Sequence, residues 1–211
     1  MISCFHSTIS SGGGYKLMPL CECVAKVDKI KWSNFNNIKL KYIDLSSVSR
    51  ENHLIINTTY INEEDAPSRA QQIVRENDVL FGTTRPMLKR VSIITSEYDN
   101  QICSTGFCVL RADVKKILPK WIYYNIETTR FYDFVNTHQE GTSYPSISDS
   151  CVKSFEIPVP SLKEQQRIVD ILDRFDKLCN DISEGLPAEI EARKKQYEYY
   201  RDKLLSFKKK N

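Results

Sequence analysis

The stretch FEIPVPSLKEQQRI, Phe155–Ile168, separates two parts of the sequence that differ in character. An apolar, strand-like run ends at Pro158 and Pro160, and Ser161 to Glu164 then has the S-x-x-E pattern of a helix-capping box. A long, highly charged segment follows. We therefore expect three parts: a disordered Ser/Gly-rich leader over 1–14, a globular domain over 15–160 and a helical arm over 161–211.

The part before this stretch has the pattern of an α+β domain with a mixed sheet. The chain of 211 residues is 41% hydrophobic and 27% charged, which is typical of a folded protein. One helix is predicted to begin at Pro119, with a stripe formed by Trp121, Tyr124, Thr128, Phe131 and Val135. Short β-like runs separated by polar turns predict strands at Lys39–Leu45, Val79–Phe81, Val91–Ile94, Phe107–Leu110 and Phe155–Val159.

The arm carries two apolar stripes. The first has a/d heptad spacing, and Gly185–Pro187 separates it from the second, as either a kink or a short turn between two helices. An uninterrupted helix would span roughly 70 Å at ~1.5 Å per residue, too long to pack on so small a domain. The arm therefore needs another helix, from its own chain or from a partner. The stripes are Ile168, Leu172, Phe175, Cys179, Ile182 and Leu186, and then Ile190, Tyr197, Tyr200, Leu204 and Phe207.

The sequence offers no support for a catalytic or metal site. The usual nucleotide-binding, metalloprotease and nucleophile-elbow motifs are absent, and the three histidines are scattered in polar segments. The acidic run Glu63–Asp65 is typical of a solvated loop. The seven cysteines predict reduced thiols in a cytoplasmic protein, although Cys21, Cys23, Cys103 and Cys108 leave a zinc site conceivable. We expect neither a secretory signal nor a transmembrane helix.

Two loops have the composition of a DNA-contacting surface. Hydroxyl and basic side chains on a fixed loop suit phosphates and guanine edges, and small residues beside an aromatic ring allow close approach. The alternatives are an internal salt bridge for Arg85 and a core position for Tyr144. The candidate DNA contacts are Thr83, Thr84, Arg85, Lys89 and Arg90 in the first loop, and Thr142, Ser143 and Tyr144 in the second.

Four segments together resemble a known family. They are NDVLFGTTRPMLKRV, ICSTGFCVLRA, GTSYPSISDSCVKSFEIPVPSLKEQQRIVDILD and LPAEIEARKKQYEYYRDKLLSF, and they are similar to the specificity (S) subunit of type I restriction–modification systems. The resemblance implies a target recognition domain that reads double-stranded DNA, followed by a helical spacer that docks methyltransferase (M) subunits; a restriction (R) subunit can also join. It implies no cofactor in this chain, with S-adenosylmethionine, ATP and Mg on the partner subunits.

A full-length member of that family carries two recognition domains and two spacers, whereas this sequence carries one of each. The expected function is therefore a non-enzymatic DNA reader that works as a homodimer on an interrupted palindrome. Two alternatives stay open: a coiled-coil assembly protein without DNA-reading activity, and a nuclease or methyltransferase in its own right. The candidate dimer or partner contacts are Ile168, Leu172, Phe175, Cys179, Ile182, Ile190, Tyr197, Tyr200, Leu204 and Phe207.

Overall fold

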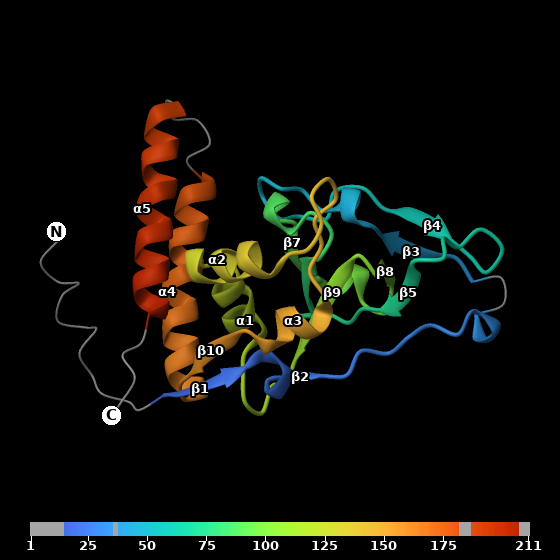
Figure 1. Ribbon diagram of the computed structural model, residues 1–211, viewed down its shortest axis with the longest axis horizontal. Coiled ribbons are helices and arrows are strands. Elements are labelled where there is room, and N and C mark those ends of the chain that lie inside the picture. The colour runs from blue at the N-terminus through green and yellow to red at the C-terminus, as the bar shows by residue number, and fades with distance from the viewer. Residues whose placement is uncertain (1–14, 36–37, 182–186, 207–211) are drawn as a thin grey trace, which may run out of the picture.

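The computed structural model describes residues 15–35, 38–181 and 187–206, without the side chains of 178–190. It has the α+β architecture predicted from the sequence (Figure 1). The strands are β1 (Lys16–Pro19), β2 (Val24–Ala25), β3 (Leu40–Ile43), β4 (Thr59–Ile61), β5 (Ala70–Ile73), β6 (Val79–Gly82), β7 (Val91–Ile93), β8 (Ile102–Ser104), β9 (Phe107–Ala112) and β10 (Glu156–Val159). The α-helices are α1 (Pro119–Ile126), α2 (Thr129–His138), α3 (Asp149–Ser154), α4 (Leu162–Asp181) and α5 (Pro187–Leu205).

The described strands form three sheets. Two have four strands, in the orders β2-β9-β6-β7 and β4-β3-β8-β5, and the third pairs β1 with β10. Strands β3 and β8 are parallel and their neighbours are antiparallel, so the second sheet is mixed, as expected. The β1–β10 pair joins the beginning of the described chain to the strand that precedes the arm.

The sheet that contains β6 and β9 is buried on both faces. Phe81 and Cys108 lie in the core cluster shared with the helices, whereas Leu80 and Val109 lie in the cluster shared with the second sheet. Because successive side chains of a strand point to opposite faces, both sets must be apolar. This double burial explains why VLFG and FCVL read as unbroken apolar runs and not as alternating ones.

The single helix predicted from Pro119 onward is wrong, because two helices occupy this segment. Helix α1 ends at Ile126, and Thr128 has an extended backbone with φ −69° and ψ 151°. The Thr128 hydroxyl accepts a hydrogen bond from the backbone N–H of Phe131 at 3.3 Å, which is the geometry of an N-cap. The sequence interpretation placed Thr128 in an apolar stripe, whereas it starts a second helix.

The helix start predicted at Ser161 is confirmed. Helix α4 begins at Leu162, and the Ser161 hydroxyl accepts from the backbone N–H of Glu164 at 3.3 Å. The other half of the capping box does not form as expected. The Glu164 carboxylate instead receives two hydrogen bonds from the Arg167 guanidinium, at 2.6 and 2.9 Å.

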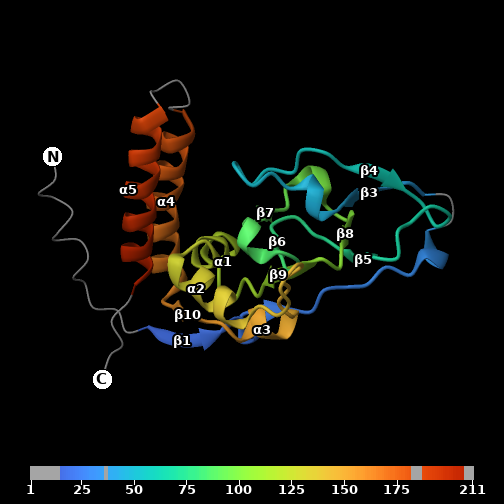
Figure 2. The ribbon, with the colours of Figure 1, turned by 45° about the horizontal axis from the view of Figure 1, so that its top comes forward.

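The arm is a hairpin of two helices. Helices α4 and α5 run side by side in both views (Figures 1 and 2). The rings of Phe175 and Tyr200 stack between them, with centroids 6.5 Å apart. The interruption near Gly185–Pro187 therefore separates two antiparallel helices, although residues 182–186 lie outside the described residues. Each helix obtains the second helix that it needs from its own chain, and the arm is much shorter than 70 Å.

The first turns of the arm are joined to the globular part by buried polar bonds. The Gln165 side chain is fully buried; it accepts from the backbone N–H of Leu118 at 2.9 Å and donates to two backbone carbonyls. Farther along α4, the Asp173 carboxylate accepts from the Tyr124 hydroxyl at 2.6 Å and pairs with Lys120 at 2.6 Å. The base of the arm is therefore continuous with the core of the domain.

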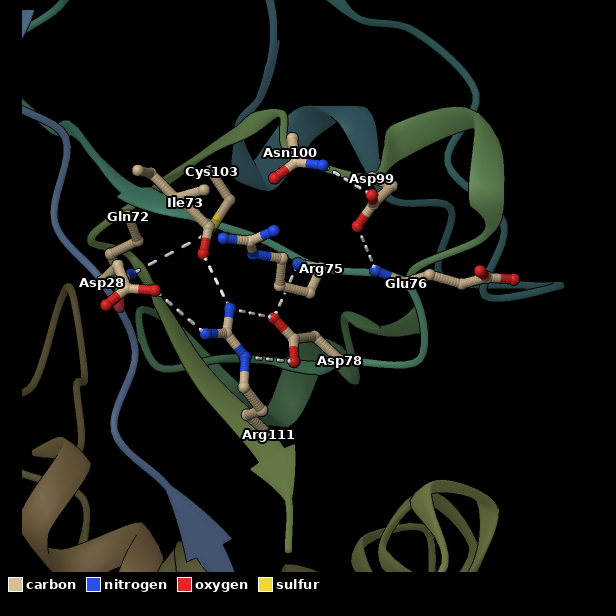
Figure 3. Close-up of polar contacts among 10 residues, drawn as sticks. All are labelled: Asp28, Gln72, Ile73, Arg75, Glu76, Asp78, Asp99, Asn100, Cys103 and Arg111. Atoms are coloured by element: carbon tan, nitrogen blue, oxygen red, sulfur yellow. Dashed lines mark hydrogen bonds and ion pairs between the residues drawn. The ribbon is translucent and has the colours of Figure 1, made fainter. Parts of the chain in front are cut away.

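A second polar network joins the two four-stranded sheets (Figure 3). Arg111 of β9 forms two hydrogen bonds with the Asp78 carboxylate, at 2.9 and 2.8 Å, and donates to the carbonyl of Ile73 in β5 at 3.0 Å. Asp78 is only 1% exposed. The guanidinium is also 3.4 Å from Asp28. This arginine is structural, since its donors are used within the fold.

Candidate DNA interface

The two loops that the sequence singled out lie side by side. The backbone N–H of Arg85 donates to the carbonyl of Pro145 at 2.7 Å, and the N–H of Ile147 donates to the carbonyl of Thr83 at 3.0 Å. A β-bridge joins Thr84 to Ser146. Figure 1 shows the segment between α2 and α3 rising beside the segment between β6 and β7. The first loop (residues 83–90) and the second loop (residues 140–146) therefore form one surface, which we call the paired-loop surface.

The backbone of this surface is held in unusual conformations. Arg85 and Lys89 have left-handed φ angles of 50° and 53°, one on each side of a 3-10 turn that begins at Pro86. A left-handed L-residue costs on the order of 1–3 kcal/mol and persists only where its surroundings impose it. In the second loop, Gly141 has φ 93°, and a side chain there would be strained and would crowd the Tyr144 carbonyl at 3.3 Å. Both loops are therefore fixed and not loose connections.

Arg85 and Tyr144, one from each loop, form a pair on the outside of the molecule. The guanidinium carbon of Arg85 lies over the Tyr144 ring, 4.0 Å from its centroid. Tyr144 is 70% exposed, so the alternative that placed it in the core is wrong. Within the described residues no carboxylate pairs with Arg85, so the alternative of an internal salt bridge finds no support. The pair presents a cation and an aromatic ring to solvent.

The other predicted DNA contacts differ in how exposed their side chains are. Thr83 is 6% exposed and its hydroxyl donates to the carbonyl of Gly106 at 2.9 Å, so little of this side chain is available for a DNA contact. The hydroxyl is occupied in closing the base of the loop. Lys89, Thr142 and Ser143 are exposed, and Thr84 and Arg90 are half-buried.

A group of titratable side chains lies behind Lys89, and no sequence pattern predicted it. The Glu127 carboxylate accepts from the Tyr132 hydroxyl at 3.2 Å and lies 3.6 Å from Nδ1 of His53, which is 3.0 Å from the Tyr123 hydroxyl. Burial raises the pKa of Glu127 to about 7 and lowers the pKa of His53. Lys89 Nζ lies over the Tyr132 ring, 4.7 Å from its centroid. No local pattern signals this group, because its members come from separate segments.

The remaining candidates for chemistry are structural. Cys103 and Cys108 lie in different core clusters, and burial raises the pKa of both thiols; it raises that of Cys23 to about 11. Among the described residues no three His, Cys, Asp or Glu side chains gather as metal ligands would. Residues 63–65 form an exposed turn, as expected.

Several of the residues predicted to contact a partner through the arm are packed within the chain itself. Ile168 and Leu172 are 2% and 0% exposed and belong to the core of their own domain, so they leave no surface for another helix. Phe175 and Tyr200 are half-buried against each other inside the hairpin. Tyr197 and Leu204 are partly buried against the same core. Ile182 and Phe207, and the side chains of Cys179 and Ile190, lie outside the described residues.

None of the described helices is both long enough and apolar enough to cross a membrane.

Similarity to known proteins agrees with this architecture. Residues 21–192 match the family described as "Type I restriction modification DNA specificity domain". The chain is 40% identical over 157 residues to the Type I restriction enzyme EcoR124I/EcoR124II specificity subunit of Escherichia coli, which covers 71% of this chain and 37% of that subunit. It is 40% identical over 104 residues to a putative type I specificity subunit of Mycoplasma pneumoniae, covering 48% of this chain and 41% of the relative.

Two solved structures have the same fold over most of the chain. The HsdS subunit from Thermoanaerobacter tengcongensis superposes with a TM-score of 0.71 at 31% identity, over 81% of this chain and 43% of that one. The second is a chain from a structure described as the structural basis of complex assembly and conformational transition of the type I R-M system. It superposes with a TM-score of 0.74 at 30% identity, over 80% of this chain and 44% of that one. The chain spans less than half the length of these relatives. It belongs to the type I restriction–modification specificity subunit family.

Proposed function

We propose that this chain reads a DNA half-site for a type I restriction–modification complex and performs no catalytic step itself. The observation that carries the proposal is the paired-loop surface. Two segments far apart in the sequence, each with the composition of a DNA contact, meet there and expose Arg85, Lys89 and Tyr144. Basic and hydroxyl side chains on a fixed backbone are suited to phosphates and base edges.

In this proposal the chemistry belongs to other subunits. Methyltransferase (M) subunits supply methylation with S-adenosylmethionine, and a restriction (R) subunit supplies cleavage with ATP and Mg. The relative described in terms of complex assembly in a type I R-M system supports such partners. The buried free thiols of Cys23, Cys103 and Cys108 are consistent with action in the reducing cytoplasm.

We further propose that two copies associate through their helical hairpins on an interrupted palindrome. Helix α4 has 20 residues, so each hairpin is about 30 Å long. That length is comparable with one turn of DNA, ~34–36 Å, and suits two half-sites on one face of the duplex. Because Ile168 and Leu172 are already buried, the second copy would contact the outer face of the hairpin, where Tyr199 of α5 is 61% exposed.

Two measurements test the proposal: the mass of the assembly in solution and its sequence-selective binding to DNA. Light scattering of the chain, alone and with its M subunit, is expected to show two copies in at least one condition. Selection from a random duplex library by the same complex is expected to recover one two-part motif, with affinity that falls as salt rises. A monomer in both conditions would refute the symmetric arrangement. Assembly with the M subunit but no sequence-selective binding would favour an assembly protein.

A further inference from the structure

Basic side chains of the paired loops and of the sheet that carries the first loop differ in the contacts they make. Arg111, at the end of β9 away from that loop, has its donors taken by Asp78 and a backbone carbonyl. Lys89 is directed toward the face of Tyr132. Arg85 is exposed, and among the described residues its guanidinium makes neither a hydrogen bond nor an ion pair. Arg85 and Lys89 therefore both keep their donors for a ligand, but only the Arg85 guanidinium offers them in a planar fork that can engage two acceptors at once.

The contact that Arg85 does make leaves those donors free. Its guanidinium carbon lies over the Tyr144 ring at 4.0 Å from the centroid. A guanidinium is planar and its five N–H donors point outward from its edges, whereas attraction to an aromatic face does not use those bonds. Since Tyr144 is 70% exposed, the pair is open to solvent.

The backbone fixes both members of the pair. Arg85 is held in the left-handed region at φ 50°, and its N–H is bonded to the carbonyl of Pro145, the residue next to Tyr144. The neighbouring Thr84–Ser146 bridge ties the two loops together. A side chain that is ordered before binding loses less entropy when it binds, so this arrangement favours a contact of defined geometry.

We infer that Arg85 reads one guanine of each DNA half-site through the major groove, and that Tyr144 is the positioning residue that orients its guanidinium. The inference rests on the proposed DNA-reading function. Lys89 and Arg90 then serve as contacts to phosphates, where a single positive charge is enough.

Guanine is the base that matches this donor arrangement. Its major-groove edge presents two adjacent acceptors, O6 and N7, which accept two N–H donors of one guanidinium. Adenine presents N7 as an acceptor beside an amino donor, so one of the two bonds is lost and two donors face each other. The expected preference for guanine over adenine at this position is about tenfold or more.

The test uses the full chain assembled with its M subunit, and duplexes carrying the motif selected by the unmodified protein. Each base pair is substituted in turn, and affinity is measured for Arg85→Lys, Tyr144→Ala and Tyr144→Phe, with Lys115→Ala as an exposed control in the turn after β9. Circular dichroism melting verifies that each variant is folded.

Arg85→Lys is expected to abolish most of the preference for guanine at one position of each half-site and to leave the other positions unchanged. Tyr144→Ala is expected to weaken the preference at that same position, and Tyr144→Phe to retain it because the ring face remains. If Arg85→Lys changes the affinity by the same factor for every sequence, or changes it for none, Arg85 does not read a base and the inference is overturned. Unchanged selectivity with Tyr144→Ala would overturn the role of Tyr144.

These outcomes are distinct from a failure of the proposed function. If the unmodified complex selects no motif, the DNA-reading proposal itself fails. If it selects a motif that Arg85→Lys leaves unchanged, the chain reads DNA through other residues and only the present inference fails.

Discussion

Arg111 and Arg85 are the same kind of side chain in two opposite settings. Arg111 is bonded twice to a carboxylate that is 1% exposed, and it helps to hold two sheets together. Arg85 lies on an exposed ring, and in the described part of the chain it forms no ion pair. The partner of an arginine, more than its presence in a basic loop, therefore distinguishes a structural side chain from one available to a ligand.

The largest effect on stability is expected from Arg111→Ala. This change leaves the buried Asp78 carboxylate without its counter-charge, and losing one member of a buried pair costs about 3–5 kcal/mol of unfolding free energy. Urea denaturation followed by circular dichroism measures it, with Lys115→Ala as a surface control expected to stay within about 0.5 kcal/mol.

A double variant measures the interaction energy between Arg111 and Asp78. Arg111→Met with Asp78→Asn removes both charges, so it is expected to lose less stability than the sum of the two single variants. Losses that simply add would show that the two side chains act independently, and the structural role assigned to Arg111 would then be wrong.

A smaller, pH-dependent effect is expected from Glu127→Gln, in the group between the paired loops and the arm. Burial raises the pKa of Glu127 from 4.5 to about 7, so between these values the folded state binds more protons than the unfolded state. The stabilisation from this carboxyl is therefore complete below about pH 4.5 and is lost as the pH rises through 7. Relative to the Gln variant, the wild type is expected to lose about 3 kcal/mol from pH 4.5 to pH 8.

The measurement compares urea denaturation of the two proteins across this pH range. Several charged groups surround Glu127: Lys89, His53, Arg201 and Asp176. Burial lowers the pKa of His53, which gives a slope of opposite sign, so the comparison is repeated in a His53→Asn background. Asn tolerates the left-handed φ of 59° at this position. A difference independent of pH would show that Glu127 does not titrate in this window.

The smallest effect on stability is expected from Arg85→Ala. The substitution removes an exposed cation–aromatic contact and leaves no buried group without a partner, so the loss is expected to be about 1 kcal/mol or less. The same denaturation experiment checks it. A loss as large as that of Arg111→Ala would remove the contrast between the two arginines and indicate that Arg85 also supports the fold.

Parts of this architecture could be predicted because they depend on neighbouring residues. The start of α4 follows from the local Ser161–Glu164 pattern, and β6 and β9 follow from short apolar runs. The division between α1 and α2 was missed because Thr128 fits a helical stripe by spacing while its hydroxyl caps a new helix. Spacing alone does not distinguish these two roles.

The site was predictable in composition but not in arrangement. All eight predicted DNA contacts stay predictions, and Thr83 is the one among them that is buried, with its hydroxyl bonded to Gly106. The group around Glu127 and His53 carried no signal, since each member is unremarkable within its own segment.

Local sequence was enough to predict the runs that form β6 and β9, the start of α4, the chemistry of the two loops and the resemblance to the specificity family. These properties depend on residues close together in the chain. The three-dimensional structure was needed to show that the two loops meet, that the arm folds back on itself and that Arg111 has a carboxylate partner while Arg85 has none among the described residues. Hydrogen bonds and packing between distant segments determine these features, and no local pattern encodes which distant partner a side chain will find.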